Sequence, residues 1–276
     1  MNIKPPLIIA SGPAGRGEYL PFLNPRYIGA YTLKTITYKP KKGNPSPRMR
    51  EGEFYVINRI GLENPGIEGF LREFEEGVYE KLLEKMKVIL SLGGDDLDEY
   101  VRITEKVKGI SDNFLAIEYN FSCPNVKNGG LSVISDVEAW EKVLEKIRRI
   151  LPNAFLIAKL GIEGLFVEVA SEKVAKAGWN GVTLINSVRG YHFDRDGVEI
   201  AGGLSGPLMK PIALRAVYEV KRRLKDIYVI GCGGVFSYED AMVFFQVGAD
   251  AVCIGSALFK DPEIANAVGK KLLERG

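Results

Sequence analysis

The chain has 276 residues, of which 46% are apolar and 26% are charged, the composition of an ordinary globular protein. Its net charge of +2 is too close to neutral to indicate a nucleic-acid-binding surface. Because the chain has one histidine, His192, a multi-histidine metal site is excluded, and we predict no metal. Three cysteines without regular spacing do not make a disulfide framework.

The beginning of the sequence lacks the apolar stretch of a signal peptide, and no run of about 18 apolar residues is present to span a membrane. We therefore expect a cytoplasmic protein with neither a membrane nor a nucleic acid as partner. Barrels of the α/β class routinely reach this length as one domain, so residues 1–276 are predicted to form a single domain.

Eight short apolar runs recur along the chain, and amphipathic helical patterns separate most of them. The runs are continuous rather than alternating, as in parallel strands buried on both faces. This order predicts an α/β fold, the closed (β/α)8 barrel. An open doubly wound sheet is the alternative, but it would want a GxGxxG turn after the first strand. The predicted strands are Leu7–Ser11, Ile28–Lys34, Val88–Leu92, Leu115–Asn120, Phe155–Leu160, Gly181–Asn186, Tyr228–Gly231 and Ala251–Gly255.

Several helix ends can be read from the sequence. Ser135 and Glu138 form a capping box before an apolar stripe with helical spacing. Phe166 begins the stripe of the next helix, and Pro211 suits the first turn of the one after it. Ser237 is positioned to cap the helix that follows the seventh strand.

Two segments interrupt the regular pattern. Lys39–Arg50 is rich in Lys, Pro and Gly, and Tyr191–Gly203 contains His192 among charged residues and glycines. Both segments follow strand ends, so we expect both at the catalytic mouth of the barrel. The alternative for the basic segment is a solvated surface. His192 is predicted to be an exposed loop residue.

Polar residues and glycines stand where the apolar strands end. Barrel enzymes carry their active sites at these C-terminal strand ends. A bound ligand rich in hydrogen-bonding groups would satisfy the polar groups together. The residues are Ser11, Gly12, Lys34, Thr35, Asn120, Lys159, Asn186, Ser187, Gly233, Gly234, Gly255 and Ser256.

The last two strands end in Gly233-Gly234 and Gly255-Ser256. Glycines let backbone N–H groups approach a phosphate, and a helix N-terminus after the last strand would add a positive field. Many barrels bind phosphate at this place, so we predict a phosphate site. The alternative is two ordinary tight turns.

Lys159 ends the fifth strand among apolar residues, and Lys34 ends the second. A lysine in such surroundings is costly to desolvate without a negative partner. We expect the partner to be an anionic or electron-rich cofactor edge. A structural salt bridge is the alternative.

Cys123 lies on the loop after the fourth strand, between Asn120 and Asn125. A cysteine is more often a small buried hydrophobe, and Cys232 and Cys253 fit that interpretation because each lies at a buried strand end. Cys123 does not fit it, because polar residues surround it.

At this point the sequence resembles a known family. Asn120–Asn125 followed by Val126–Gly130 closely resembles the signature of the cysteine-using class 1 dihydroorotate dehydrogenases. The resemblance extends over nearly the whole chain. Further matching segments are Lys34-Thr35, Gly43–Pro45 with Pro47-Arg48, Asn58 and Ile60–Leu62 with Asn64–Gly66, Gly202–Pro207 and Gly231–Gly234.

The resemblance implies an FMN-dependent enzyme that oxidises dihydroorotate to orotate in pyrimidine synthesis, with Cys123 as the catalytic base. It places Lys159 near the pyrimidine edge of the flavin and the phosphate at the last two strand ends. The implied FMN contacts are Ser11, Gly12, Lys34, Thr35, Asn120, Lys159, Ile185, Gly206, Gly233, Gly234, Gly255 and Ser256. The implied orotate contacts are Lys34, Asn58, Ile60, Gly61, Leu62, Asn120, Asn125, Asn186 and Ser187.

Val126–Gly130 looks like class 1B, whose members pair with an iron–sulfur and FAD subunit and pass electrons to NAD⁺. This implies a homodimer within a heterotetramer. Fumarate-dependent class 1A enzymes are the alternative, whereas class 2 enzymes use serine at position 123. The chain departs from the family at Gly161-Ile162, where Ser-Pro is common, and at Pro13-Ala14.

Three other readings remain open. A dihydropyrimidine dehydrogenase shares the cysteine motif and would use uracil or thymine, although Lys34 favours a carboxylated substrate. A transfer RNA dihydrouridine synthase would need a basic RNA-binding surface, which is not evident. A non-catalytic flavin-binding protein would not need Cys123, Lys159 and Lys34 together.

Overall fold

The computed structural model describes residues 1–122, 124–125, 131–132, 134–164 and 166–275. Within these residues, eight parallel strands pair in the order β2-β1-β15-β14-β11-β10-β7-β6, and the pairing of β2 with β6 closes the barrel. The predicted (β/α)8 barrel and all eight predicted strands are confirmed. The strands are β1 (Leu7–Ile9), β2 (Ala30–Thr32), β6 (Val88–Gly93), β7 (Ala116–Asn120), β10 (Leu156–Leu160), β11 (Gly181–Leu184), β14 (Tyr228–Cys232) and β15 (Ala251–Ile254).

The inside of the barrel is layered. Its lower part is an apolar cluster that includes Ile8, Ile89, Ile157 and Ile230. Side chains two residues further along a strand point the same way, so the next inward layer is largely polar. That polar layer, which lies under the barrel mouth, holds Ser91, Glu118, Lys159, Thr183, Cys232 and Cys253.

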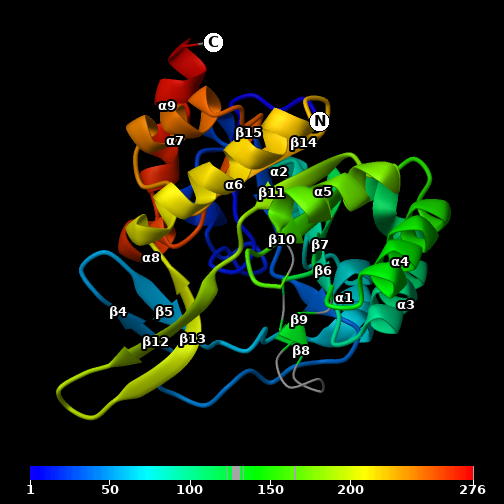
Figure 1. Ribbon diagram of the computed structural model, residues 1–276, viewed down its shortest axis with the longest axis horizontal. Helices are drawn as coiled ribbons and strands as arrows, with labels where there is room; N and C mark the ends of the chain where they lie inside the picture. The colour runs from blue at the N-terminus through cyan, green and yellow to red at the C-terminus, as the bar shows by residue number, and fades with distance from the viewer. Residues whose placement is uncertain (123, 126–130, 133, 165, 276) are drawn as a thin grey trace.

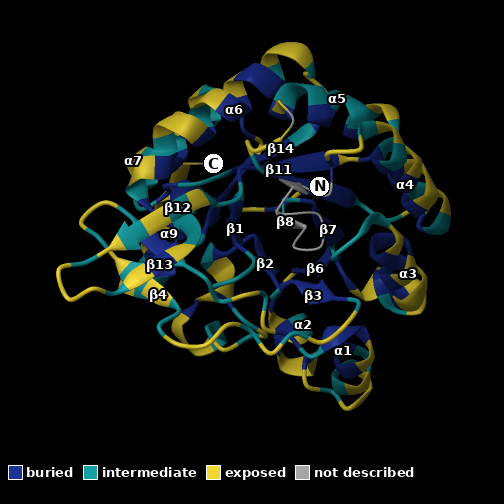
Figure 2. Cartoon of the chain, turned by 60° about the horizontal axis from the view of Figure 1, so that its bottom comes forward, coloured by how far each residue is buried: buried dark blue, intermediate teal, exposed yellow. Residues whose placement is uncertain are grey.

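Helices form the outer layer, and Figure 2 shows their outer faces exposed around a buried barrel. They pack on the outward-facing apolar side chains of the strands, which join the larger core cluster. No helix in the described part of the chain is long and apolar enough to cross a membrane. The helices are α1 (Gly66–Glu75), α2 (Glu80–Lys85), α3 (Leu97–Val107), α4 (Val137–Ile150), α5 (Val167–Lys176), α6 (Lys210–Arg223), α7 (Tyr238–Gln246), α8 (Ala257–Lys260) and α9 (Ile264–Arg275).

Helix ends agree with the sequence in part. Pro211 lies in the first turn of α6, and the Ser237 side chain caps α7 by accepting a hydrogen bond from the Asp240 N–H at 3.1 Å. The capping box at Ser135 is wrong, because Asp136 caps α4 and accepts from the Ala139 N–H at 3.0 Å. Phe166 precedes α5 and is 76% exposed, so its predicted place in the apolar stripe is also wrong.

A second, antiparallel sheet stands beside the barrel mouth, in the order β12-β13-β5-β4 (Figure 1). Its strands are β12 (Val188–Phe193), β13 (Glu199–Ser205), β5 (Val56–Asn58) and β4 (Met49–Glu51). Three shorter strands form two further pairings. β3 (Ile36–Thr37) extends the barrel beside β6, and β8 (Pro124–Asn125) pairs with β9 (Leu131–Ser132).

The segment Tyr191–Gly203 is therefore a hairpin of this sheet rather than a loop. The prediction that His192 is an exposed loop residue is wrong. It lies on β12, its side chain is 13% exposed, and its Nδ1 is 3.0 Å from the Tyr55 hydroxyl. The cause is the alternation of β12, which turns His192 inward and leaves Tyr191 and Phe193 exposed.

Candidate active site

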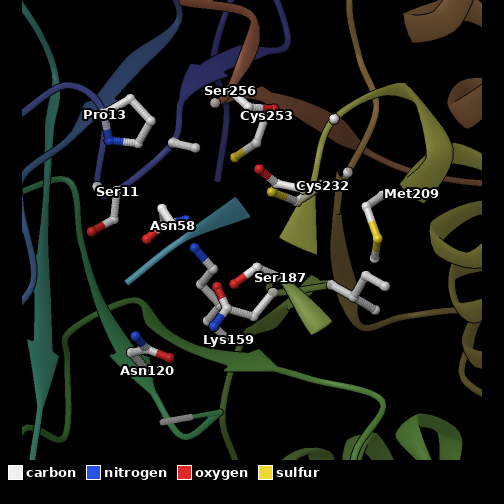
Figure 3. A pocket seen from close by; sticks show the side chains of 18 of the residues that line it. Ser11, Pro13, Asn58, Asn120, Lys159, Ser187, Met209, Cys232, Cys253 and Ser256 are labelled. Atoms are coloured by element: carbon white, nitrogen blue, oxygen red, sulfur yellow. The ribbon is translucent and has the colours of Figure 1, made fainter. Parts of the chain in front are cut away.

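A cleft opens at the carboxyl ends of the barrel strands, and the second sheet forms one of its walls (Figure 3). The structure brings nearly all of the predicted site residues to this cleft. Those that line it are Ser11, Gly12, Lys34, Thr35, Asn58, Ile60, Leu62, Asn120, Lys159, Ile185, Asn186, Ser187, Gly206, Gly233, Gly234, Gly255 and Ser256.

Three predicted residues stand apart from that group. Gly61 does not line the cleft, although its neighbours Ile60 and Leu62 do. Cys123 lies outside the described residues. Asn125 is described only as part of the strand β8.

The Lys159 ammonium is the most enclosed charge of the cleft. Lys159 is 6% exposed, comes from the end of β10 and lines the cleft. Within the described residues it forms no ion pair and donates no hydrogen bond. Burial lowers the pKa of Lys159, but the nearby charge of Glu118 raises it, with smaller contributions from the two inward-facing cysteines, and that pKa lies above its ordinary value.

Lys34 places a second ammonium group in the same cleft, just after β2. It too forms no ion pair or side-chain hydrogen bond among the residues that the structure describes. Burial and, after it, the nearby charge of Lys159 lower the pKa of Lys34. Two unpaired cations that repel one another inside one cleft indicate an anionic ligand.

A chain of hydroxyl groups crosses the floor of the cleft. Ser11 Oγ lies 3.0 Å from Thr35 Oγ1, which lies 2.9 Å from Ser91 Oγ. The chain joins the ends of β1 and β2 to β6, so it ties three strand ends together. Ser11 and Thr35 remain in the lining, where a polar ligand can reach them.

Asn120 is held from two sides. The Ser122 hydroxyl donates to Asn120 Oδ1 at 2.7 Å, and the Tyr100 hydroxyl donates to the Asn120 carbonyl at 2.6 Å. Because the side-chain oxygen is occupied as an acceptor, the amide nitrogen of Asn120 is the group left to donate to a ligand.

Asn58 and Ser187 form the wall where the second sheet meets the barrel. Asn58 Nδ2 donates to the Gly203 carbonyl at 3.4 Å, across the pairing of β5 with β13. A Cβ at Gly203 would lie 2.4 Å from Ser187 Oγ, so glycine is required for this close approach. Asn58, Ser187 and Lys159 all line the cleft and are labelled in Figure 3.

Glycines form the opposite end of the cleft. Gly233 and Gly234 have φ values of 126° and 80°, which favour glycine. A Cβ at Gly234 would lie 2.7 Å from the backbone nitrogen of Lys210. The helix after β15 is α8, which has 4 residues, so the expected field from a helix N-terminus there is small. Backbone N–H groups and Ser256 remain as the donors for an anion.

Some lining residues were missed by sequence reasoning. Cys232 and Cys253 were predicted to be buried small hydrophobes, yet both line the cleft, as paired residues of β14 and β15. Hydrogen bonding to Cys253 lowers the pKa of the Cys232 thiol, and the same contact raises the pKa of Cys253. Alternation from the inward-facing Ile230 and Ala251 would have identified them. The other missed lining residues are Ala10, Pro13, Ser205, Met209, Val235 and Phe259.

The geometry defines a class: a (β/α)8 barrel enzyme whose mouth is built for an anionic, hydrogen-bonding ligand. The dihydroorotate dehydrogenase family model matches residues 1–275, so the chain belongs to the dihydroorotate dehydrogenase family. It is an oxidoreductase, and the family implies a flavin cofactor. The predicted resemblance to this family is confirmed.

Individual relatives agree with the family assignment. Dihydroorotate dehydrogenase B (NAD(+)), catalytic subunit, of Thermotoga maritima is 54% identical over 274 residues, covering 99% of this chain and 98% of the relative. The catalytic subunit of the same name from Desulforudis audaxviator is 36% identical, covering 99% and 89%. A crystal structure of DHODH from Eimeria tenella in complex with ferulenol has a TM-score of 0.80 at 19% identity, covering 98% of this chain and 81% of that one; it supports the fold alone.

Replacing Lys34 by methionine should stabilise the ligand-free protein. The folded state lowers the pKa of Lys34 from 10.5, so the charged side chain opposes folding at neutral pH, and this penalty fades as the pH rises toward that value. We expect the midpoint of thermal unfolding to rise by roughly 2–4 °C at neutral pH and the gain to shrink in alkaline buffer. Lys42→Met, at an exposed position, is the control and should change little. A lower midpoint for Lys34→Met than for the wild type would contradict this interpretation.

Proposed function

We propose that the chain is the FMN-containing catalytic subunit of a class 1B dihydroorotate dehydrogenase, which oxidises dihydroorotate to orotate in pyrimidine synthesis. Residues 1–276 serve as its single FMN-binding domain. The observation that carries the proposal is the pair of enclosed, unpaired ammonium groups of Lys34 and Lys159 in the cleft of a member of this family.

The cleft residues fit FMN from end to end. The backbone N–H groups of Gly233, Gly234 and Gly255, with the Ser256 hydroxyl, would hold the phosphate. Ser11 and Thr35 would contact the flavin or its ribityl chain, alongside the backbone at Gly12, Ile185 and Gly206. Lys159 would donate to the pyrimidine edge of the ring, and the flavin, when bound, would supply the hydride acceptor for the oxidation.

The substrate would lie between the flavin and the wall formed by the second sheet. Lys34 is the cation available for the orotate carboxylate, which is why this chain fits dihydroorotate better than the uncharged dihydrouracil. The amide groups of Asn58, Asn120 and Asn186 and the Ser187 hydroxyl would bind the pyrimidine edges. Ile60 and Leu62, with the intervening Gly61, would pack at its side, and Asn125 would complete the set.

Cys123 is the proposed base. Oxidation requires removal of a proton from the carbon next to a carbonyl, and the chain offers no histidine in the cleft lining. An unperturbed thiol has a pKa of about 8.5, so only a minor fraction is thiolate at neutral pH. Turnover should therefore rise on the alkaline side of neutrality.

A separate partner subunit is implied, because the relatives are named as catalytic subunits. We propose that this partner carries an iron–sulfur cluster and FAD, passes electrons to NAD⁺ and joins a homodimer of this chain in a heterotetramer. The chain itself has 3 cysteines, too few for a four-cysteine cluster of its own. Cytoplasmic localisation is part of the same proposal.

Replacing Ser256 by aspartate should weaken FMN binding selectively. The new carboxylate would face the proposed phosphate. Repulsion between these two negative groups should lower the affinity for FMN about tenfold or more. Riboflavin, which has no phosphate, should bind both proteins alike. Fluorescence titration of the flavin-free protein measures both affinities, and Ser256→Asn is the isosteric, uncharged control. Equal losses for FMN and riboflavin would refute the phosphate assignment.

Replacing Cys123 by alanine should abolish flavin reduction by substrate while leaving the flavin bound. Loss of a general base typically lowers the rate about 10²–10⁴-fold. The measurement is anaerobic bleaching of flavin absorbance after mixing with dihydroorotate, with dihydrouracil as the comparison substrate. The wild type should bleach with dihydroorotate and not with dihydrouracil, and Cys123→Ser is the conservative control. Unchanged bleaching of the alanine variant would exclude Cys123 as the base.

A further inference from the structure

Glu118 is a buried carboxylate that none of the roles above uses. It lies on β7, is 3% exposed and does not line the cleft. The register of β7 with β10 pairs Glu118 with Ile157 and pairs Asn120 with Lys159. Glu118 therefore lies one inward-facing step below Lys159, on the neighbouring strand.

One hydrogen bond holds this carboxylate in place. Glu118 Oε2 accepts from the Thr183 hydroxyl at 2.7 Å, and Thr183 is the residue of β11 that pairs directly with Lys159 on β10. Glu118 Oε1 is buried and has no hydrogen-bond partner among the described residues. A carboxylate with one oxygen unsatisfied inside a barrel is costly unless a nearby charge compensates it.

Lys159 supplies that charge. Its side chain and that of Glu118 both point into the barrel, from adjacent strands, with Thr183 completing the group on a third. No salt bridge joins the two charges directly, which leaves the ammonium free to face the cleft. Lys159 thus has a counter-charge behind it and an open cleft in front of it.

We propose that Glu118, fixed by Thr183, is a positioning residue for Lys159: it holds the ammonium charged and directed into the cleft where the flavin ring binds. This inference rests on the proposed function, because it requires the flavin to lie against Lys159. Glu118 itself does not line the cleft.

Every charged or titratable group that faces Lys159 bears on the prediction. Glu118 from β7 raises its pKa, as do Cys232 from β14 and Cys253 from β15. Lys34, at the end of β2, repels it. Glu118 makes the largest of the contributions that raise the pKa of Lys159. Removing its charge should therefore let the buried ammonium lose its proton at a lower pH.

The test is the Glu118→Gln variant, which keeps the shape of the side chain and an acceptor for Thr183 but removes the charge. Its readout is the midpoint potential of the FMN-loaded full chain, measured against reference dyes from about pH 6 to about pH 10. In the wild type, Lys159 stays protonated, so the positive charge that favours the reduced ring persists through the range. In Glu118→Gln, the alkaline potential should fall below that of the wild type as the ammonium deprotonates. The expected shift is about tenfold in the reduction equilibrium, or ~30 mV for a two-electron couple.

Four variants make the result specific. Glu118→Asp retains the charge and should follow the wild type. Thr183→Val leaves the charge but removes the hydrogen bond, so it should shift the alkaline potential in the same direction by less; it carries the test if Glu118→Gln does not fold. Adding Lys159→Met to Glu118→Gln should abolish the fall of the midpoint potential in the alkaline range. Adding Cys232→Ala to Glu118→Gln should leave that fall in place.

The outcomes separate this inference from the proposed function. If Lys159→Met lowers the potential but Glu118→Gln tracks the wild type at every pH, the role of Glu118 is refuted and the flavin site stands. If Lys159→Met also leaves the potential unchanged, Lys159 does not face the flavin. The contact between Lys159 and the flavin is then refuted, both in the proposed function and in the proposed role of Glu118. If the alkaline fall of the potential seen in Glu118→Gln persists when Lys159→Met is added, the role of Glu118 is refuted as well.

Discussion

The site depends on two lysine ammonium groups inside one barrel mouth. Neither forms an ion pair or a side-chain hydrogen bond among the described residues. Lys159 is 6% exposed, and Lys34 stands close enough that the charge of Lys159 lowers its pKa. Removing such charges from water is costly unless an anion compensates them. The family implies a flavin cofactor. In the proposed function, the ring of that flavin lies against Lys159 and a carboxylated pyrimidine lies against Lys34.

The barrel and the second sheet each supply part of this cleft. Strand ends carry Lys159, Asn120 and the glycine turns, and an apolar layer of isoleucines below them keeps the strands closed. Residues placed on strands are held more rigidly than residues placed on loops, which suits a cofactor site. The second sheet supplies Asn58, and with it the wall where the proposed substrate binds.

Much of this site could be predicted from the sequence because barrel physics concentrates function at strand ends. Continuous apolar runs identified all eight barrel strands in the described residues. The polar residues at the ends of these strands line one cleft. Lys159 and Asn120 are examples, since each stands out against the apolar residues before it. The glycine turns at Gly233 and Gly255, where we propose that the phosphate binds, were recognisable for the same reason.

The sequence was less informative about features that depend on which distant strands pair. The sheet that holds His192 is made of short, glycine-rich strands that pair across more than a hundred residues, as Gly203 with Asn58 does. Cys232 and Cys253 were interpreted as small buried hydrophobes because each follows an apolar strand, and the strand pairing shows that they lie side by side in the cleft lining. Glu118 was one polar residue in a buried run, and its meaning depends on the neighbouring strands.

The most direct test of the central claim is a crystal structure of the full chain with FMN and orotate bound. We predict the Lys159 ammonium within about 3.2 Å of the flavin ring and the Lys34 ammonium within hydrogen-bond distance of a ligand oxygen. Both cations would then contact groups of the bound ligands. A flavin bound elsewhere, with the two ammonium groups still facing water, would contradict the assignment of the cleft.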